Sequence, residues 1–217
     1  MGGMSLEASM YAQPTTSKGH ATRSRLMACA RAEAIRTSGR IEIAAVASAA
    51  GVVPSLVHRY FGSKAGLVSA LVDDFFDRLQ AEVLLVNLDD VGDWAARERR
   101  RLELGVRFHY EDPFAVVLYG QLAREATVAR TEAIRISTVI KQAAAGIRQA
   151  QRSGELPREV DPEFAGAAMF GAMQRVMVEA LRRKRRPSER SVVDVLWRQV
   201  AASVHLDLEA TRRHAGR

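Results

Sequence analysis

The spacing of apolar residues is the feature that most restricts the fold of this 217-residue chain. Apolar side chains recur every three or four residues along most of the sequence, whereas runs that alternate apolar and polar residues are nearly absent. Gly39 and Gly51 stand where two apolar segments stop, because glycine accepts the left-handed backbone that ends a helix. Asp112-Pro113 and Asp161-Pro162 each pair a helix cap with a proline suited to the first helical position. The pattern predicts an all-α protein.

We expect about nine helices, bounded by these start and stop signals. Their ranges are 22–38, 43–50, 54–61, 64–86, 94–110, 113–121, a long helix that includes Ala133 and ends at Gly154, 162–183 and 188–208. Residues 1–20 are expected to form a flexible N-terminal arm. Residues 21–66 then form a small three-helix head, and residues 67–210 form a larger helical body.

Composition narrows the class of protein further. Hydrophobic residues make up 47% of the chain and charged residues 26%, which is typical of a globular protein. The single cysteine, Cys29, excludes an internal disulfide and fits a reducing compartment, so we expect a cytoplasmic protein. The longest apolar tract, Phe164–Leu181, contains Arg175 and Glu179, whose charges are too costly for a membrane span. We interpret this tract as a helix in a deep core or at a subunit interface.

The positive charge of the chain is concentrated near its N-terminus. The net charge is +7, and residues 18–64 contain eight Lys and Arg but only two Asp and Glu. The rest of the chain is almost neutral. This distribution indicates a module that binds a polyanion, attached to a neutral body. The alternative is a basic solvated surface that has no partner.

Two short helices joined by a glycine turn lie inside this basic region. Helix 43–50, the turn Gly51-Val52-Val53 and a helix that begins at Pro54 have the spacing of a helix-turn-helix. The second helix suits the major groove of double-stranded DNA, where its first residues face base edges and its flanks face phosphates. The candidate DNA-binding residues are Pro54, Ser55, His58, Arg59, Tyr60 and Lys64. The alternative is a bend between two core helices with incidental cations.

The run VASAAGVVPSLVHRYFGSKAGL, residues 46–67, resembles the DNA-binding signature of TetR (tetracycline-repressor-like) transcriptional regulators. The matching residues are Ala47, Ala50-Gly51-Val52, Tyr60-Phe61, Ser63-Lys64 and Leu67. The resemblance implies that the first three helices bind operator DNA and that the body binds a small-molecule effector and forms a homodimer. It implies a ligand-responsive repressor of a palindromic operator. The alternative is a helical small-molecule-binding or scaffold protein whose DNA-binding head has degenerated.

Four positions depart from the pattern of that family. Glu42 stands where threonine often contacts a phosphate, and Val53 replaces the usual serine before the recognition helix. His58 stands where tyrosine is common, and Ala65 replaces a glutamate after the lysine. Glu42 repels the DNA backbone, and Val53 removes a helix cap. These departures predict an altered operator preference.

The resemblance places an effector site inside the helical body, where cavities between helices are apolar with a few polar groups. The candidate lining residues are Phe76, Leu102, Val106, His109, Phe114, Leu118, Gln121, Met169 and Met173. His109 is of special interest because it is a polar residue on the apolar stripe of its helix. The alternative is that these residues are ordinary core, since aromatic and methionine side chains fill cores by default.

The last two predicted helices are the candidates for a homodimer interface. Small residues in 162–183 permit close approach of helices, and Trp197 is a candidate anchor. The predicted interface residues are Ala167, Phe170, Gly171, Val178, Leu196, Trp197 and Val200. The alternative is that the same two helices pack only within one chain.

Signatures of enzymes are missing from the sequence. It contains no Gly-rich phosphate loop, no HExxH or GxSxG motif and no paired cysteines with metal-site spacing. We therefore expect no enzymatic activity, no cofactor and no metal site. The basic run Arg182–Arg186 is interpreted as cations at a helix C-terminus that favour the helix dipole, in preference to a nucleic-acid site.

Overall fold

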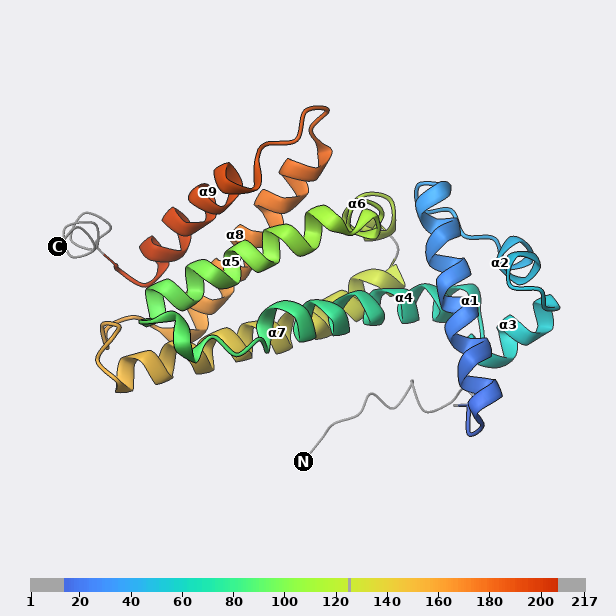
Figure 1. The fold of residues 1–217 in the computed structure, drawn as a ribbon, viewed down its shortest axis with the longest axis horizontal. Helices are drawn as coiled ribbons and strands as arrows, with labels where there is room; N and C mark the ends of the chain where they lie inside the picture. The colour runs from blue at the N-terminus through green and yellow to red at the C-terminus, as the bar shows by residue number, and fades with distance from the viewer. Residues whose placement is uncertain (1–13, 125, 207–217) are drawn as a thin grey trace. The chain divides into compact units, whose positions relative to one another are not determined.

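The computed structural model describes residues 14–124 and 126–206, so residues 1–13 of the predicted arm lie outside it. Within this part the chain contains nine α-helices and no strand, which confirms the predicted all-α class (Figure 1). The α-helices are α1 (Ser17–Arg36), α2 (Ile43–Ala49), α3 (Pro54–Phe61), α4 (Lys64–Leu79), α5 (Trp94–Glu111), α6 (Pro113–Tyr119), α7 (Ala126–Arg152), α8 (Pro162–Arg182) and α9 (Glu189–Ser203). A π-helix, η2 (Gln80–Leu84), follows α4, and two 3₁₀ turns, η3 (Asp89–Val91) and η4 (Leu122–Arg124), complete the elements.

The start of α1 and the end of α9 differ from the expected helix bounds, in both places because of neighbouring residues. α1 begins at Ser17, earlier than residue 22, because the Thr16 hydroxyl accepts a hydrogen bond from the Gly19 N–H at 3.1 Å and caps the helix. α9 ends at Ser203, earlier than residue 208. There His205 has a left-handed φ of 56°, and the N–H of the next residue returns to the Ala201 carbonyl at 2.9 Å.

The end of α4 differs for a reason that lies elsewhere in the chain. α4 ends at Leu79 rather than near residue 86, and the chain continues as the π-helix η2. Nη1 of Arg101, on α5, donates to the carbonyls of Val83 and Leu84 at 2.8 Å each. These bonds satisfy carbonyl groups that the wider π turn leaves without a helical partner.

The chain divides into two compact units. Unit 1 comprises the residues up to Phe76 together with Pro113–Glu132, and unit 2 comprises Asp77–Asp112 together with the residues from Ala133 onward. α4 and α7 therefore each contribute residues to both units. The expected boundary between residues 66 and 67 falls within α4, inside unit 1. The head proposed from the sequence is thus one part of unit 1.

Unit 1 is built around α1, which packs against α2 and α6, while α2 packs against α3. Leu26 of α1, Ile41 before α2 and Val57 of α3 are completely buried. Gly39 closes the turn between α1 and α2 with a φ of +102°, and a Cβ there would lie 2.8 Å from the Cβ of Gln121. Only glycine fits both the backbone angle and the space. This packing fixes α2 and α3 against α1.

Unit 2 is a helical layer in which α9 packs against both α5 and α8. Gly105 lets α5 approach α8 closely, because a Cβ at this position would lie 2.6 Å from the Cε of Met173. Leu196 and Val200 of α9 are completely buried by this packing. None of the helices in the described ranges, α8 included, is long and apolar enough to cross a membrane.

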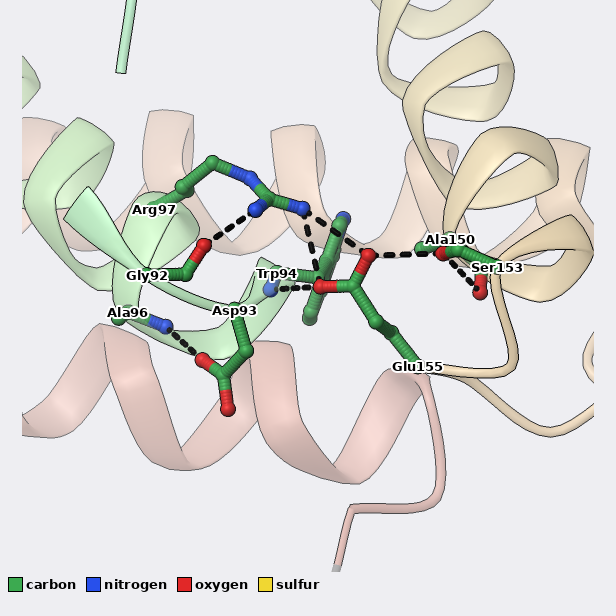
Figure 2. Close-up of polar contacts among 8 residues, drawn as sticks. All are labelled: Gly92, Asp93, Trp94, Ala96, Arg97, Ala150, Ser153 and Glu155. Atoms are coloured by element: carbon green, nitrogen blue, oxygen red, sulfur yellow. Dashed lines mark hydrogen bonds and ion pairs between the residues drawn. The ribbon is translucent and has the colours of Figure 1, made fainter. Parts of the chain in front are cut away.

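A carboxylate fixes the turn after α7 to the start of α5 within unit 2. Figure 2 shows Glu155 accepting hydrogen bonds from the Trp94 N–H, from the Ser153 hydroxyl at 2.7 Å and from Nη2 of Arg97 at 3.0 and 3.2 Å. Beside it, Asp93 caps α5 by accepting from the Ala96 N–H at 2.8 Å. The Ser153 bond, together with Trp94 and Arg97, lowers the pKa of Glu155 below the usual range of a glutamate, although partial burial opposes this.

Candidate nucleic-acid interface

A glycine turn sets the direction in which α3 leaves α2. Gly51 has a φ of +65°, and its N–H donates to the Ser48 carbonyl at 3.0 Å. The N–H of Val52 donates to the Ala47 carbonyl at 2.9 Å. A Cβ at Gly51 would meet no atom within 4 Å, so the backbone angle rather than space requires glycine here. Pro54 then begins α3 at a position where its missing N–H costs nothing.

α3 has a buried side and an exposed side. Val57 and Phe61 are buried, and the guanidinium of Arg23 on α1 lies 5.3 Å from the Phe61 ring centroid. This anchoring holds the opposite side of α3 towards solvent. The predicted DNA contacts on the exposed side are Pro54, Ser55, His58 and Arg59, and Tyr60 is half-buried beside them.

The polar side chains of α3 are not equally available to a partner. Arg59 is exposed and forms no ion pair with any residue in the described ranges. His58 lies with its Nδ1 3.2 Å from the Gly62 carbonyl oxygen, and because that oxygen can only accept, Nδ1 is the donor in this contact. The ring of His58 is therefore hydrogen-bonded to the C-cap residue of α3. Arg59 is the cation that α3 offers outward.

The start of α4 presents Lys64 beside this helix. The hydroxyl of Ser63 accepts from the Gly66 N–H at 3.0 Å and caps α4. A Cβ at Gly66 would lie 2.0 Å from the carbonyl oxygen of Phe61, so α4 can follow α3 this closely only with glycine there. The tight passage from α3 to α4 keeps Lys64 next to the exposed side of α3.

A negative charge lies close to Lys64. The carboxylate of Glu42 is 3.8 Å from the Lys64 ammonium, and the two side chains are 74% and 48% exposed. An ion pair this exposed contributes little to stability. It does lower the positive potential at a predicted phosphate contact. The departure at Glu42 therefore acts on Lys64, a coupling that the sequence did not reveal.

Val53 is a candidate contact that the predicted set did not contain. It precedes α3 as its N-cap, makes no side-chain cap hydrogen bond and is 63% exposed. Its signal in the sequence is an apolar residue at a position where a capping side chain is expected. An exposed valine at the tip of α3 presents methyl groups beside the polar side chains of that helix.

The candidate effector residues fall in different units. Phe76, Phe114 and Leu118 are buried in unit 1, and the rings of the two phenylalanines both lie near Phe75. Gln121, also in unit 1, is exposed and lies against Gly39. The candidates in unit 2 are Leu102, Val106, His109 and Met169, which are buried, and Met173, which is half-buried. A lining role for either set stays a prediction.

His109 is engaged by its own helix. Its Nδ1 lies 2.7 Å from the carbonyl oxygen of Gly105, so Nδ1 donates in this contact. Its ring meets Phe108 edge-on, with the ring centroids 5.5 Å apart. Burial lowers the pKa of His109, although the Gly105 bond and the carboxylate of Asp112 oppose the shift. The imidazole is therefore a neutral polar group inside unit 2 at pH 7.

The predicted dimer residues differ in how much surface they leave for a partner. Leu196 and Val200 are fully buried within one chain, and Trp197 is nearly so. On α8, Ala167 is exposed. The remaining members of the predicted set, Phe170, Gly171 and Val178, are half-buried. The surface available to a second chain therefore lies on α8 more than on the predicted stripe of α9.

Residues 39–71 match the model of a family described as bacterial regulatory proteins, tetR family. No curated protein sequence matches the chain. Among solved structures, a chain from Rhodococcus sp. assigned provisionally to the TetR-family transcriptional regulators is 22% identical, with a TM-score of 0.69, over 84% of this chain and 98% of that one. RolR in complex with resorcinol is 19% identical, with a TM-score of 0.67, over 91% and 94%. AibR in complex with isovaleryl coenzyme A and operator DNA is 17% identical, with a TM-score of 0.60, over 86% and 99%.

The matched segment contains the elements that form the candidate interface. It runs from Gly39 at the α1–α2 turn to Leu71 in α4, and includes the Gly51 turn, all of α3 and Lys64. The match confirms the resemblance seen in residues 46–67, and the solved structures share the all-α fold. The α2–α3 module of this chain is therefore similar to that of the tetR family of bacterial regulatory proteins, and its fold is shared with solved structures described as TetR-family transcriptional regulators.

Proposed function

We propose that the chain is a cytoplasmic, ligand-responsive transcriptional repressor that binds a palindromic operator as a homodimer. The observation that carries this proposal is the exposed side of α3, held outward by the Gly51 turn and by the buried Val57 and Phe61. It lies within the stretch 18–64, where basic residues outnumber acidic ones eight to two. A short helix presented in this way on a basic module suits the major groove.

Each polar side chain at the α3 surface has a proposed contact with the bases or the phosphates of DNA. Arg59 is positioned to bond guanine or phosphate with its forked guanidinium. Ser55, in the first turn of α3, adds a hydroxyl for a base edge or a phosphate. Tyr60 and Lys64 are assigned to phosphates, which fix the register of the helix in the groove. Two copies related by a twofold axis would read half-sites about 10 bp apart, or a multiple of that spacing.

The outer side of α8 is the proposed surface for the second copy. Phe164 is 78% exposed near the start of α8, and Ala167 and Ala168 are exposed on the next turn. An aromatic side chain this exposed, next to small residues that allow close approach, is typical of an interface. Val195 on α9 is a further exposed apolar residue of unit 2.

The body is proposed to bind an apolar effector that carries a hydrogen-bonding group. Support comes from the buried apolar residues Leu102, Val106 and Met169 and from the neutral His109 among them. RolR and AibR, whose fold this chain shares, are described in complex with resorcinol and isovaleryl coenzyme A. An effector that binds one conformation of the dimer better than another shifts the population away from the DNA-binding form. The proposal includes no catalytic step and no cofactor.

A second candidate is a helical small-molecule-binding or scaffold protein with a degenerate head. The carboxylate of Glu42 beside Lys64 and the missing side-chain cap at Val53 favour it. Both features weaken contacts that a DNA-binding head ordinarily uses. The two functions differ in one measurable property, which is salt-sensitive binding to duplex DNA through α3.

The test is a selection from a random duplex library with the full chain, followed by fluorescence anisotropy on the enriched sequence. We expect enrichment of a palindrome. Arg59→Ala should weaken binding to it by about 5- to 150-fold, the range for loss of one base-reading arginine. Arg36→Ala is the matched control, because Arg36 is exposed in unit 1 but already pairs with Glu33 at 2.8 Å. If no sequence is enriched and the wild-type chain binds no duplex, the second candidate replaces the first.

A further inference from the structure

Five consecutive basic residues, Arg182–Arg186, comprise the last residue of α8 and the start of the loop that leads to α9 (Figure 1). We call them the cationic loop, and all five are exposed. The sequence predicted that they would favour the dipole of the preceding helix. α8 ends at Arg182, and its C-cap Arg183 has extended backbone, with φ −71° and ψ 136°. A helix dipole acts over about one turn, so it does not account for the residues from Lys184 onward.

The far end of the cationic loop is held against α5. The guanidinium of Arg186 lies 5.7 Å from the ring centroid of Tyr110, and its Nη1 donates to the Tyr110 carbonyl at 3.4 Å. The hydroxyl of Tyr110 donates to the carbonyl of Pro187 at 3.0 Å. These contacts lie within unit 2. They hold the positive charges at a defined place on its surface.

Most of this charge is not compensated by nearby carboxylates. Arg183 pairs with Glu179 at 3.2 Å. In the described part of the chain, Arg182, Lys184 and Arg185 form no ion pair. Cations this close together repel one another, and a bound polyanion would relieve that repulsion.

We propose that the cationic loop is a second DNA contact, which binds the phosphate backbone without regard to sequence. Four of its five residues are arginines, whose planar forks match phosphate oxygens. A membrane surface fits less well, because no large apolar side chain is exposed between Arg182 and Glu189 to enter the lipid. The inference rests on the proposed function, since duplex DNA is the polyanion that α3 would bring to the protein.

The experiment removes charge from two residues of the loop that form no ion pair with the described residues and lie beyond the end of α8. Lys184→Gln combined with Arg185→Gln is compared with Arg152→Gln combined with Arg158→Gln. The control pair is exposed, lies in the same unit, forms no ion pair with the described residues and makes the same change in net charge. Binding to an operator duplex and to a scrambled duplex is measured by anisotropy at roughly 50 to 200 mM salt.

The loop variant should weaken binding to both duplexes by the same factor, about tenfold, because it loses sequence-independent phosphate contacts, and the ratio of the two affinities should stay unchanged. The slope of log affinity against log salt should become shallower by about two, because each lost phosphate contact removes about 0.9 from it. The control pair should keep the wild-type slope.

Three other results would overturn the inference, and they separate it from the proposed function. Equal behaviour of the loop and control variants, with Arg59-dependent operator binding intact, rejects the loop contact alone. Failure of the wild-type chain to bind any duplex rejects both. Loss of binding to phosphatidylserine-rich vesicles in the loop variant, with DNA binding unchanged, assigns the loop to a membrane surface instead.

Discussion

At the scale of single residues, we expect the residue that precedes α3 to influence which operator sequence the protein prefers. Val53 is 63% exposed and makes no cap hydrogen bond, so its two methyl groups are presented at the tip of the helix. In the major groove the apolar feature of a base edge is the C5-methyl group of thymine. A serine at this position would offer a hydroxyl and a cap instead. We therefore expect Val53 to favour thymine where the first turn of α3 meets the bases.

Deoxyuridine tests this expectation, because it removes only the methyl group of thymine. Each thymine of the selected operator is replaced in turn, and binding is measured by anisotropy. One replacement in each half-site should weaken the wild-type protein about fourfold, since burying one methyl-sized group contributes about 0.8 kcal/mol. Val53→Ser should bind the thymine and deoxyuridine duplexes equally, with Val53→Ala between the two. A methyl dependence that is the same in wild type and Val53→Ser would contradict the assignment.

At the scale of elements, the carboxylate of Glu155 joins the turn after α7 to the start of α5 (Figure 2). The pKa of Glu155 is lowered in the folded protein, mainly by the Ser153 hydrogen bond. Its ionised form is therefore bound more favourably in the folded state than in the unfolded chain. This stabilisation is present above the unfolded pKa and is lost as pH falls through the folded one.

Glu155→Gln should lower the free energy of unfolding by about 1 to 2 kcal/mol at pH 7, because charge-assisted bonds to a partly exposed carboxylate are lost. The difference from wild type should be smaller at about pH 3, because this stabilisation is lost as the pH falls from the unfolded pKa of about 4.3 through the lowered pKa of folded Glu155. Urea unfolding at the two pH values measures the difference in the free energy of unfolding between the variant and wild type. Glu159→Gln is the control, since Glu159 is exposed, and it should change stability little at either pH. A difference for Glu155→Gln that is constant with pH would show that the bonds do not depend on its charge.

The elements that could be predicted are those whose ends depend on neighbouring residues. α3 begins at Pro54 and ends at Phe61 as the sequence predicts, because proline and glycine act locally. The change from α4 to η2 could not be predicted, because it involves Arg101 on a different helix. Periodicity marks the apolar stripe of α9 but does not show which helices pack against it; these are α5 and α8, and Leu196 on this stripe is fully buried. The same limit applies to Glu42, whose neighbour Lys64 is brought to it only by the folded module.

At the scale of the whole molecule, the proposed function requires two copies of the chain. One α3 reads one half-site, so the preference for a palindrome depends on the surface that joins the copies. Phe164 is the most exposed of the large apolar side chains in the described ranges, at 78%. In a twofold interface each side chain occurs twice, so one substitution acts at two places.

Phe164→Glu should therefore weaken the dimer by about 100-fold or more, because two phenylalanines lose a buried environment worth about 1.5 to 3 kcal/mol each. Sedimentation velocity across a dilution series measures the change. Ile134→Glu is the matched control, since Ile134 is 54% exposed on α7 of the same unit and should leave the dimer intact. The monomeric variant should still bind a single half-site through α3 but lose its preference for two half-sites in the correct spacing. A Phe164→Glu protein that stays dimeric would place the interface away from the outer side of α8, and full palindrome affinity in a monomer would mean that one head carries the whole recognition.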